Sequence, residues 1–173
     1  RAFEDSPIGM ALVSVEGRFL RVNRTLCEIT GFRDDELLGR TYQEITHPED
    51  LESDVALAEK AVAGAIRTYQ MEKRYVRGDG RTVWVKLSVT LVRDDAGQPL
   101  YFVSEVEDIE ERKRTQLELQ RLANFDVLTG LGNRRKLTDD LQLAFAESPR
   151  REPHLLVVLD LNGFKQYNDM FGH

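Results

Sequence analysis

Cysteine is almost absent from this sequence: Cys27 is the only one among 173 residues. A single cysteine excludes an internal disulfide and any zinc site built from several cysteines, and it favours a reducing compartment. Long apolar runs are also missing, since no stretch approaches the roughly 20 residues that span a bilayer, and no signal peptide is recognisable. We therefore expect a cytoplasmic segment without membrane contact. Because the chain begins at Arg1 rather than Met, we expect it to come from a longer protein, which could be membrane-anchored elsewhere.

Basic residues are also fewer than acidic residues in this sequence. Lysine and arginine number 24 against 30 acidic residues, the formal net charge is −6, and no basic tract is longer than a run such as Arg112-Lys113-Arg114. Nucleic-acid binding needs a basic surface that displaces phosphate counterions, so we do not expect a nucleic-acid partner. Apolar residues make up 41% and charged residues 31%, a balance typical of a globular chain with a buried core. The length predicts one domain and part of a second.

The first hundred residues combine strand patterns with short helices. Five runs have the composition or alternation of strands: residues 10–15, 18–22, 68–77, 82–93 and 100–106. Helices are predicted between the second and third runs by caps at Asn23 and Asp34, by stops at Gly31 and Gly39, and by apolar spacing over 51–63. Hairpin-length connections, such as Glu16-Gly17, predict an antiparallel sheet with helices on one face, an α+β arrangement.

Four stretches occur in the order found in PAS domains: SPIGMALVSVEGRFLRVN, ITGFRDDELLGRTYQEITHPEDL, YVRGDGRTVWVKLSV and FVSEVEDIEERK. Residues 1–108 therefore resemble a PAS sensory domain. The resemblance implies a five-stranded antiparallel sheet with helices on one face. It also implies a sensory role, but PAS domains differ in what they bind: some hold haem, some flavin, some a small metabolite, and some nothing known.

The residues do not identify a PAS ligand or cofactor. Haem needs an axial ligand, usually histidine, but the helix over 51–63 contains none, and His47 beside Pro48 favours a capping or loop role over ligation. Cys27 is interpreted as a small core residue rather than a flavin-reactive thiol. Trp84 lies on the face of its strand opposite the apolar set, which favours packing or partner contact over cofactor stacking.

Residues 109–124 are predicted to form a helical connector. Asp108 and Glu111 have the spacing of a capping box at its start. One interpretation is a solvated surface helix. The other is a signalling helix that pairs with its copy through Leu119 and Leu122, and the PAS resemblance favours this homodimer through the PAS domain and connector. The connector has no histidine to accept phosphate, so a histidine-kinase output is not expected.

The last third of the chain has an apolar helical stripe followed by a strand pattern. The stripe comprises Leu137, Leu141, Ala144 and Phe145. Leu155–Leu159 is continuously apolar, which predicts a central strand buried on both faces with Asp160 at its carboxyl end. A carboxylate there faces a ligand crevice, and the amides of a helix that opens next can receive phosphate.

FDVLTGLGNRR and LVVLDLNGFKQYNDMFGH resemble the amino-terminal part of a GGDEF domain, the catalytic domain of diguanylate cyclases. Residues 125–173 are therefore expected to begin an incomplete α/β nucleotide-cyclase domain with a ferredoxin-like palm. In this family, two GTP molecules are joined into cyclic di-GMP with Mg²⁺. The resemblance implies these roles: Asp160 and the Leu161 carbonyl as metal ligands, Asp160 and Lys165 in catalysis, and Gly163, Phe164 and Asn168 in GTP binding. For Lys165, a solvated helix position is the alternative.

This sequence differs in two features from the pattern of a complete GGDEF domain. Many family members carry a second Asp where this chain has Asn162, which offers a carbonyl oxygen but no charge. The chain also ends at His173, before the GGDEF loop, so we expect this fragment to be inactive. In the opening motif, Asp126 is expected to form a structural ion pair with Arg134 or Arg135 rather than to take part in chemistry.

The sequence therefore predicts the regulatory region of a bacterial-type signalling protein in which a PAS domain controls a diguanylate cyclase. One alternative is a PAS module attached to a degenerate GGDEF domain that binds GTP or acts as a scaffold, possibly ahead of a phosphodiesterase domain. A third interpretation is a sensory dimerisation module alone. An intact GG[DE]EF loop would favour synthesis, whereas loss of its acidic metal ligand would favour a binding role.

Overall fold

The computed structural model describes residues 2–147, 155–159, 162 and 169–170. The chain forms two compact units, residues 1–120 and 121–173. Within the described residues, no helix is both long enough and apolar enough to cross a membrane.

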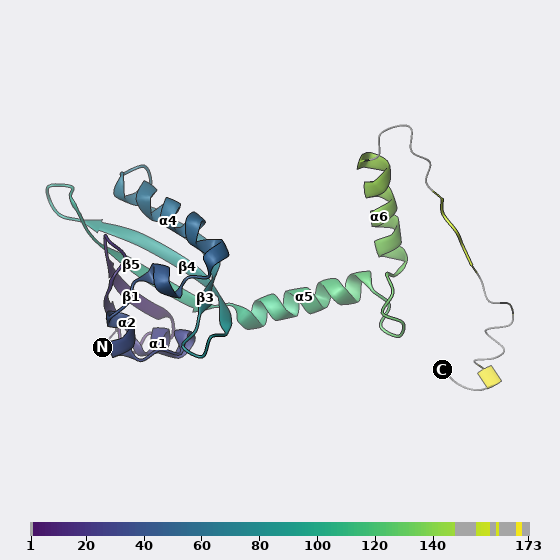
Figure 1. The fold of residues 1–173 in the computed structure, drawn as a ribbon, viewed down its shortest axis with the longest axis horizontal. Coiled ribbons are helices and arrows are strands. Elements are labelled where there is room, and N and C mark those ends of the chain that lie inside the picture. The colour runs from purple at the N-terminus through teal and green to yellow at the C-terminus, as the bar shows by residue number, and fades with distance from the viewer. Residues whose placement is uncertain (1, 148–154, 160–161, 163–168, 171–173) are drawn as a thin grey trace. The chain divides into compact units, whose positions relative to one another are not determined.

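The first unit is built on a five-stranded sheet in the order β2-β1-β5-β4-β3 (Figure 1). Its strands are β1 (Gly9–Ser14), β2 (Phe19–Val22), β3 (Thr68–Val76), β4 (Thr82–Arg93) and β5 (Pro99–Asp108). All neighbouring strands are antiparallel. The first strand of the chain thus lies between β2 and β5. The sheet is complete only when β1 pairs with β5, which joins residues about ninety positions apart, such as Ala11 and Ser104.

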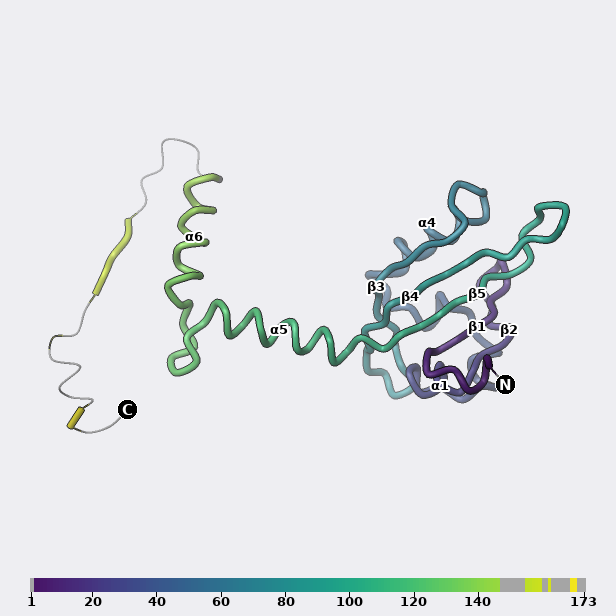
Figure 2. Tube along the Cα trace, turned by 180° about the vertical axis from the view of Figure 1, so that it is seen from behind, coloured from purple at the N-terminus to yellow at the C-terminus, as the bar shows by residue number. Residues whose placement is uncertain are grey.

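Four helices cover one face of this sheet (Figures 1 and 2). They are α1 (Arg24–Thr30), α2 (Asp34–Leu38), α3 (Tyr42–Ile45) and α4 (Pro48–Val62). All four lie in the chain between β2 and β3, as the sequence predicted for its helices, although α3 was not predicted. The predicted PAS arrangement, a five-stranded antiparallel sheet with helices on one face, is confirmed.

Side-chain caps explain where the short helices begin. Asn23 Oδ1 accepts hydrogen bonds from the backbone amides of Met10 (2.8 Å) and Leu26 (3.0 Å), so the predicted cap of α1 also binds β1. Gly31 ends α1 with φ 70°, a left-handed conformation that glycine adopts without strain. The prediction for α2 is off by one residue: Arg33 is the cap, and its amide donates to Glu36 Oε2 at 2.8 Å.

The core lies between the sheet and these helices. The predicted period of two in β4 is confirmed, because its inward side chains are no more than 5% exposed: Val83, Val85, Leu87, Val89 and Leu91. They pack with buried side chains of the short helices, among them Leu26, Leu37 and Ile45. Burying one such side chain stabilises a fold by about 1.5–3 kcal/mol. This core holds α4 against β3.

The second unit contains the end of α5 (Glu110–Asn124) and the predicted helix, observed as α6 (Arg134–Glu147). The strand predicted over 155–159 is not observed: these residues have no regular secondary structure and are between 57% and 90% exposed. An apolar run becomes a central strand only when neighbouring strands take its backbone hydrogen bonds. None of the described residues in this unit forms such a strand.

Candidate functional site

A small cavity of about 20 Å³ lies inside the first unit, between the sheet and α4. Its walls are mostly apolar and come from all five strands, with Phe19, Val89 and Phe102 among them. Every lining residue is buried except Tyr42 and Tyr69, which are half-buried. These two rings therefore separate the cavity from solvent.

A buried ion pair forms the polar side of this cavity. Lys73 from β3 and Asp54 from α4 have side chains 0% and 1% exposed, and Lys73 Nζ donates a short hydrogen bond to Asp54 Oδ2. The same ammonium donates to Thr46 Oγ1 at 3.0 Å and lies 4.4 Å from the centre of the Tyr75 ring. Burial lowers the pKa of Lys73, and the Asp54 carboxylate opposes this shift. The pair is thus neutral overall and enclosed.

The second oxygen of Asp54 has no partner. Oδ1 is buried and accepts no hydrogen bond, although a buried acceptor without a partner costs about 1–3 kcal/mol. Burial raises the pKa of Tyr42 to about 12. Burial, followed by the negative charge of Asp54 and a hydrogen bond from the phenol to the Asp54 side chain, also raises the pKa of Tyr69, so both phenols remain protonated. The cavity is therefore lined by one ion pair and neutral rings, one of which donates to the carboxylate.

Neither Lys73 nor Asp54 was predicted from the sequence to be a site residue. The sequence does contain an indication that Lys73 is buried. Lys73 stands between Met71 and Tyr75, and the alternation of β3 places all three on the face that points into the core. A lysine at such a position must find an anion. Asp54 shares the buried face of α4 with Ala58 and Ala61, but nothing local shows that Asp54 meets Lys73.

A second ion pair lies beside the first. Asp50 precedes Asp54 by one helical turn, and Arg74 follows Lys73 on β3. Asp50 Oδ2 accepts from the Arg74 amide at 2.8 Å and from Nε at 2.9 Å, and Oδ1 accepts from Nη2 at 2.8 Å. These hydrogen bonds hold the pKa of Asp50 below its usual value. Two successive residues of β3 are thus tied to two successive turns of α4.

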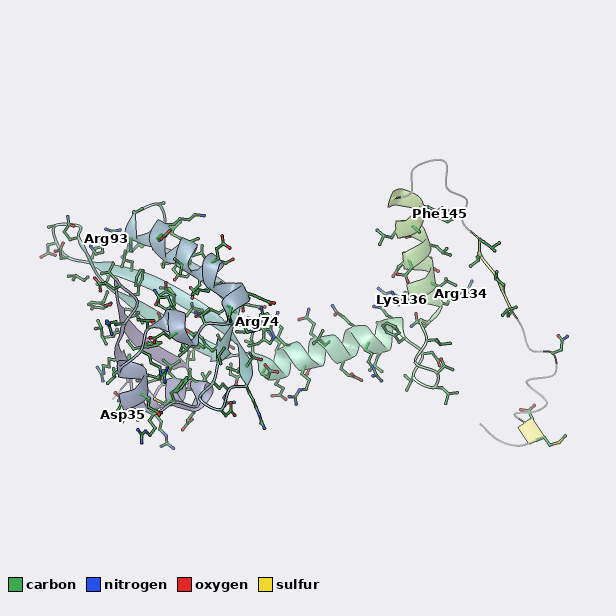
Figure 3. All side chains as sticks on the ribbon, in the orientation of Figure 1. Asp35, Arg74, Arg93, Arg134, Lys136 and Phe145 are labelled. Carbon is green, nitrogen blue, oxygen red and sulfur yellow. The ribbon has the colours of Figure 1, made fainter. Side chains whose placement is uncertain are left out.

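Arg74 also contacts Trp84 of β4, at the end of the sheet where Arg74 is labelled in Figure 3. The Arg74 guanidinium lies 5.2 Å from the centre of the Trp84 ring, and Lys113 Nζ lies 4.8 Å from the centre of the same ring. Lys113 pairs with Glu72 at 2.5 Å, and the Trp84 amide donates to Glu110 Oε2 at 3.0 Å. We call these five residues, Glu72, Arg74, Trp84, Glu110 and Lys113, the Trp84 clamp. It fastens the first turn of α5 to β3 and β4.

Several interpretations of single residues can now be compared with their surroundings. His47 caps α4, since its Nδ1 accepts from the Glu49 amide at 3.3 Å. Cys27 packs against the core, and burial raises the pKa of its thiol.

The capping box predicted before α5 is only half correct. Asp108 Oδ1 accepts from the Glu110 amide at 2.8 Å, but Glu110, not Glu111, reaches back, and its partner is Trp84 because β4 lies beside the helix start.

The turn between α5 and α6 is held by Asp126 and Asn133. Asp126 Oδ1 accepts from the amide and hydroxyl of Thr129, at 2.9 and 2.8 Å, and the hydroxyl bond lowers the pKa of Asp126. The predicted ion pair with Arg134 or Arg135 is therefore wrong: Asp126 accepts from Thr129, and Arg135 lies 4.0 Å from Asp139 on α6 instead. Asn133 Nδ2 donates to the Ala123 carbonyl at 2.8 Å, and its Oδ1 accepts from the Lys136 amide at 3.0 Å.

The cyclase-site residues suggested by the sequence lie outside the described ranges. They are Asp160, Leu161, Gly163, Phe164, Lys165 and Asn168. The structure therefore does not test whether they come together. In the part of the chain that is described, no group of three or more His, Cys, Asp or Glu side chains is arranged to hold a metal ion.

Comparison with known families agrees with the fold and the motifs. The PAS fold family matches residues 19–105, and the family described as diguanylate cyclase, GGDEF domain, matches residues 123–173. The chain belongs to the PAS family and continues into the first part of a GGDEF domain. This order of domains matches that of diguanylate cyclases, and it confirms both resemblances.

Two curated relatives and one solved structure illustrate the match. The probable diguanylate cyclase DgcE of Escherichia coli is 50% identical over 121 residues, which is 70% of this chain but 11% of DgcE. A diguanylate cyclase of Vibrio cholerae is 30% identical over 160 residues, covering 91% of this chain and 50% of the relative. The PAS domain of a Colwellia psychrerythraea protein has a TM-score of 0.60 at 18% identity, covering 64% of this chain and 93% of that domain, and shows the fold alone. This chain thus spans at most half the length of these curated relatives.

Proposed function

We propose that this chain is the sensory and regulatory region of a protein in which the PAS domain controls synthesis of cyclic di-GMP from two GTP molecules. The Trp84 clamp is the observation that carries the proposal. It joins the PAS sheet to α5, and α5 leads directly into the GGDEF match. A change in the PAS domain that alters the clamp changes the rotation or register of α5, and a coupling of about 1–3 kcal/mol is enough for such regulation.

The proposed catalytic chemistry rests on the family motif. Asp160 and the Leu161 carbonyl are oxygen donors, the ligand type that Mg²⁺ prefers, and when bound this ion would neutralise charge on the phosphates. The amides of Gly163 and Phe164 would bind the phosphates, Asn168 the guanine edge, and Lys165 would add positive charge.

Joining two GTP molecules requires two facing catalytic domains, which supports a homodimer through the PAS domain and α5. Three leucines of α5 are between 48% and 65% exposed and available for such pairing: Leu117, Leu119 and Leu122. The use of GTP also supports a cytoplasmic location for this segment.

An assay of GTP conversion tests the proposal in a protein that continues through the complete GGDEF domain. Asp160→Ala should lower turnover at least 100-fold, because magnesium catalysis supplies several kcal/mol of transition-state stabilisation. Asp95→Ala, in the exposed turn after β4, is the matched control and should leave turnover unchanged. Equal turnover in the Asp160 variant would remove that residue from the metal site. The 173-residue chain should be inactive, because its sequence contains no GGDEF loop.

Asn162 favours a second candidate function, a GGDEF domain that binds GTP without joining it. An amide at this position contributes no negative charge to a metal site. GTP binding by calorimetry without formation of cyclic di-GMP, in the longer protein, would support this candidate. Asn162→Asp would then be the variant expected to change metal affinity.

A further inference from the structure

Backbone groups along β3, an edge strand of the sheet, alternate in direction, and Arg74 shows which of them face outward. The Arg74 amide donates to Asp50 Oδ2 at 2.8 Å, and its carbonyl accepts from the His47 amide at 2.9 Å. Both partners lie outside the sheet, so the backbone groups of Arg74 face away from β4. Because β3 pairs with β4 without a shift from residue 68 to residue 76, every second residue before Arg74 has the same direction.

Three exposed residues of β3 therefore have outward backbone groups with no partner among the described residues: Thr68, Gln70 and Glu72. We call residues 68–72 the open edge. α4 begins beside the other end of β3, where Asp50 is bound to Arg74. The helix ends beside β4, where Arg93 Nη2 donates to the Ala61 carbonyl at 2.9 Å. α4 thus runs from the edge toward β4 and leaves the open edge uncovered.

The features that normally keep a sheet edge from pairing are missing from this stretch. Natural edges are short, charged, interrupted by proline or bent by a bulge. The open edge has the sequence TYQME, without proline, glycine or a bulge. Its one charged residue, Glu72, is already paired with Arg112 and Lys113. The opposite edge of the sheet differs, because the Phe19 amide of β2 donates to the Arg40 carbonyl at 3.2 Å.

The open edge is complementary to itself. A two-fold contact uses the same surface on both subunits, and in an antiparallel pair each facing pair of outward residues can exchange two main-chain hydrogen bonds. With Gln70 opposite Gln70 of the partner subunit, Glu72 lies opposite Thr68 of the partner subunit. This register places no charge opposite a like charge, the arrangement that destabilises paired strands. A second copy of the chain therefore fits the open edge.

We propose that the open edge pairs with the open edge of a second copy of this chain, so that antiparallel β3 strands join two five-stranded sheets. This interface is separate from the α5 pairing in the proposed function. α5 begins at the end of β3, where Trp84, opposite Arg74, donates to Glu110. Because the two β3 strands run in opposite directions, the two α5 helices begin at opposite ends of the joined sheet. The open edge thus joins subunits that do not share an α5 pair, and it links one such dimer to another.

Disulfide trapping in the 173-residue chain tests the register. All variants carry Cys27→Ser, so that the introduced cysteine is the only one, and Leu119→Glu, so that α5 pairing is weakened. Directly opposite residues of a hydrogen-bonded pair are about 5.5 Å apart at Cα, a separation that a disulfide spans. Gln70→Cys should therefore cross-link at least tenfold faster than Gln98→Cys, the same change in the exposed turn between β4 and β5.

Hydrogen exchange distinguishes strand pairing from accidental cross-linking. In the oxidised Gln70→Cys chain, the Glu72 amide should exchange at least tenfold more slowly than in the reduced chain, because it gains a carbonyl acceptor from the partner subunit. The Met71 amide already faces β4, so its exchange should change much less.

A charge at the two-fold position provides an independent test. Gln70→Lys places two ammonium groups opposite each other and should abolish the self-association of the Leu119→Glu chain. Because a contact between two short edges belongs to the small, weak class of interfaces, sedimentation is measured at about 0.1–1 mM chain. Gln98→Lys adds the same charge elsewhere and should leave the association intact. Circular dichroism checks that both variants fold.

The proposal is overturned if Gln70→Cys cross-links no faster than Gln98→Cys, or if the cross-link leaves the Glu72 amide unprotected. The open edge would then be available to a strand of a different protein instead. A Leu119→Glu chain that stays monomeric over this concentration range would also overturn it. None of these measurements involves GTP, so their outcome is separate from that of the Asp160 assay.

Discussion

Lys73 and Asp54 are the two buried charged residues in the part of the chain that the structure describes, and both are enclosed by the PAS core. Desolvation of two ions offsets most of their attraction, so such a pair contributes little stability as a pair. Each member nevertheless depends on the other, since removal of one leaves a buried charge. We interpret the pair as a specific polar element of the cavity rather than as a major source of stability.

The first prediction concerns this dependence. Lys73→Met should lower the free energy of unfolding by about 3–5 kcal/mol, because Asp54 is left buried and unpaired. Asp54→Leu/Lys73→Met should recover most of that loss. Urea denaturation at pH 7 measures both. A double variant that is less stable than the single variant would show that the pair itself stabilises the fold.

The second prediction concerns Asp50, whose pKa is lowered in the folded state by its hydrogen bonds to Arg74. A carboxyl group with a lowered folded pKa stabilises the protein above its unfolded pKa, about 3.9, and loses this contribution as pH falls through the folded pKa. Asp50→Asn should therefore lower the free energy of unfolding by about 1–3 kcal/mol at pH 7.

The difference between Asp50→Asn and the parent chain should shrink as the pH falls below about 4. Urea denaturation at a series of pH values measures it, with the exposed Asp95→Asn as the control. A difference that stays constant across this range would exclude titration of Asp50 as its source.

At the scale of elements, α5 is the segment whose position depends on few contacts. Its first turn is held by the Trp84 clamp and by Ile109, which is 2% exposed, whereas no residue within α5 is buried. A helix anchored at one end in this way can move as a rod when the anchor changes. The turn with Asp126 and Asn133 provides the corresponding attachment between α5 and α6.

The third prediction tests the clamp. Trp84→Ala removes the ring that lies against Arg74 and Lys113, two contacts worth about 0.5–1 kcal/mol each at exposed sites. Hydrogen exchange of the Lys113 amide, which donates to the Ile109 carbonyl at 2.9 Å at the start of α5, should then be faster by a factor of about 5–30. Trp84→Phe keeps an aromatic ring and should show a smaller change. Unchanged exchange in Trp84→Ala would mean that the ring is not needed and that the contacts left in the variant, among them the Glu72–Lys113 ion pair and Ile109, anchor the helix.

The fourth prediction tests the turn. Asn133→Ala removes the cap of α6 and the donor to the Ala123 carbonyl, and loss of a cap costs about 0.5–2 kcal/mol. Exchange of the Lys136 amide should become faster. Asn133→Asp keeps the capping oxygen but not the donor, so Lys136 should stay protected in that variant. Loss of protection in both variants would assign the effect to the link with α5 instead.

At the scale of the whole molecule, the regulatory scheme requires two copies of the chain. The fifth prediction is that the chain dimerises in solution and that Leu119→Glu weakens the dimer at least tenfold, because a charge would face the partner helix. Sedimentation measures the equilibrium. Leu38→Glu places the same change on α2, where the leucine is 44% exposed, and should leave the dimer intact. A monomeric parent chain would contradict dimerisation through this segment.

Much of the PAS domain could be predicted from the sequence because its signals are local. Alternation in β4, the caps Asn23 and His47, and glycine stops such as Gly31 each act within a few residues, and all were found where expected. The strand predicted over 155–159 had no such local signal at its ends. A continuous apolar run indicates a segment that becomes buried, but burial depends on neighbouring segments, and none covers these residues among those that the structure describes.

The sequence by itself determined the periodicity of the strands, the caps that begin α1 and α4, and the two families to which the segments belong, because each depends on residues close together in the chain. Only the tertiary structure decided which charges meet. Lys73 and Asp54 are 19 positions apart, and Trp84 and Glu110 are 26 apart. Such pairs form because helix packing and strand order bring distant segments together, and burial, which determines the energy of a charge, exists only after that packing is complete.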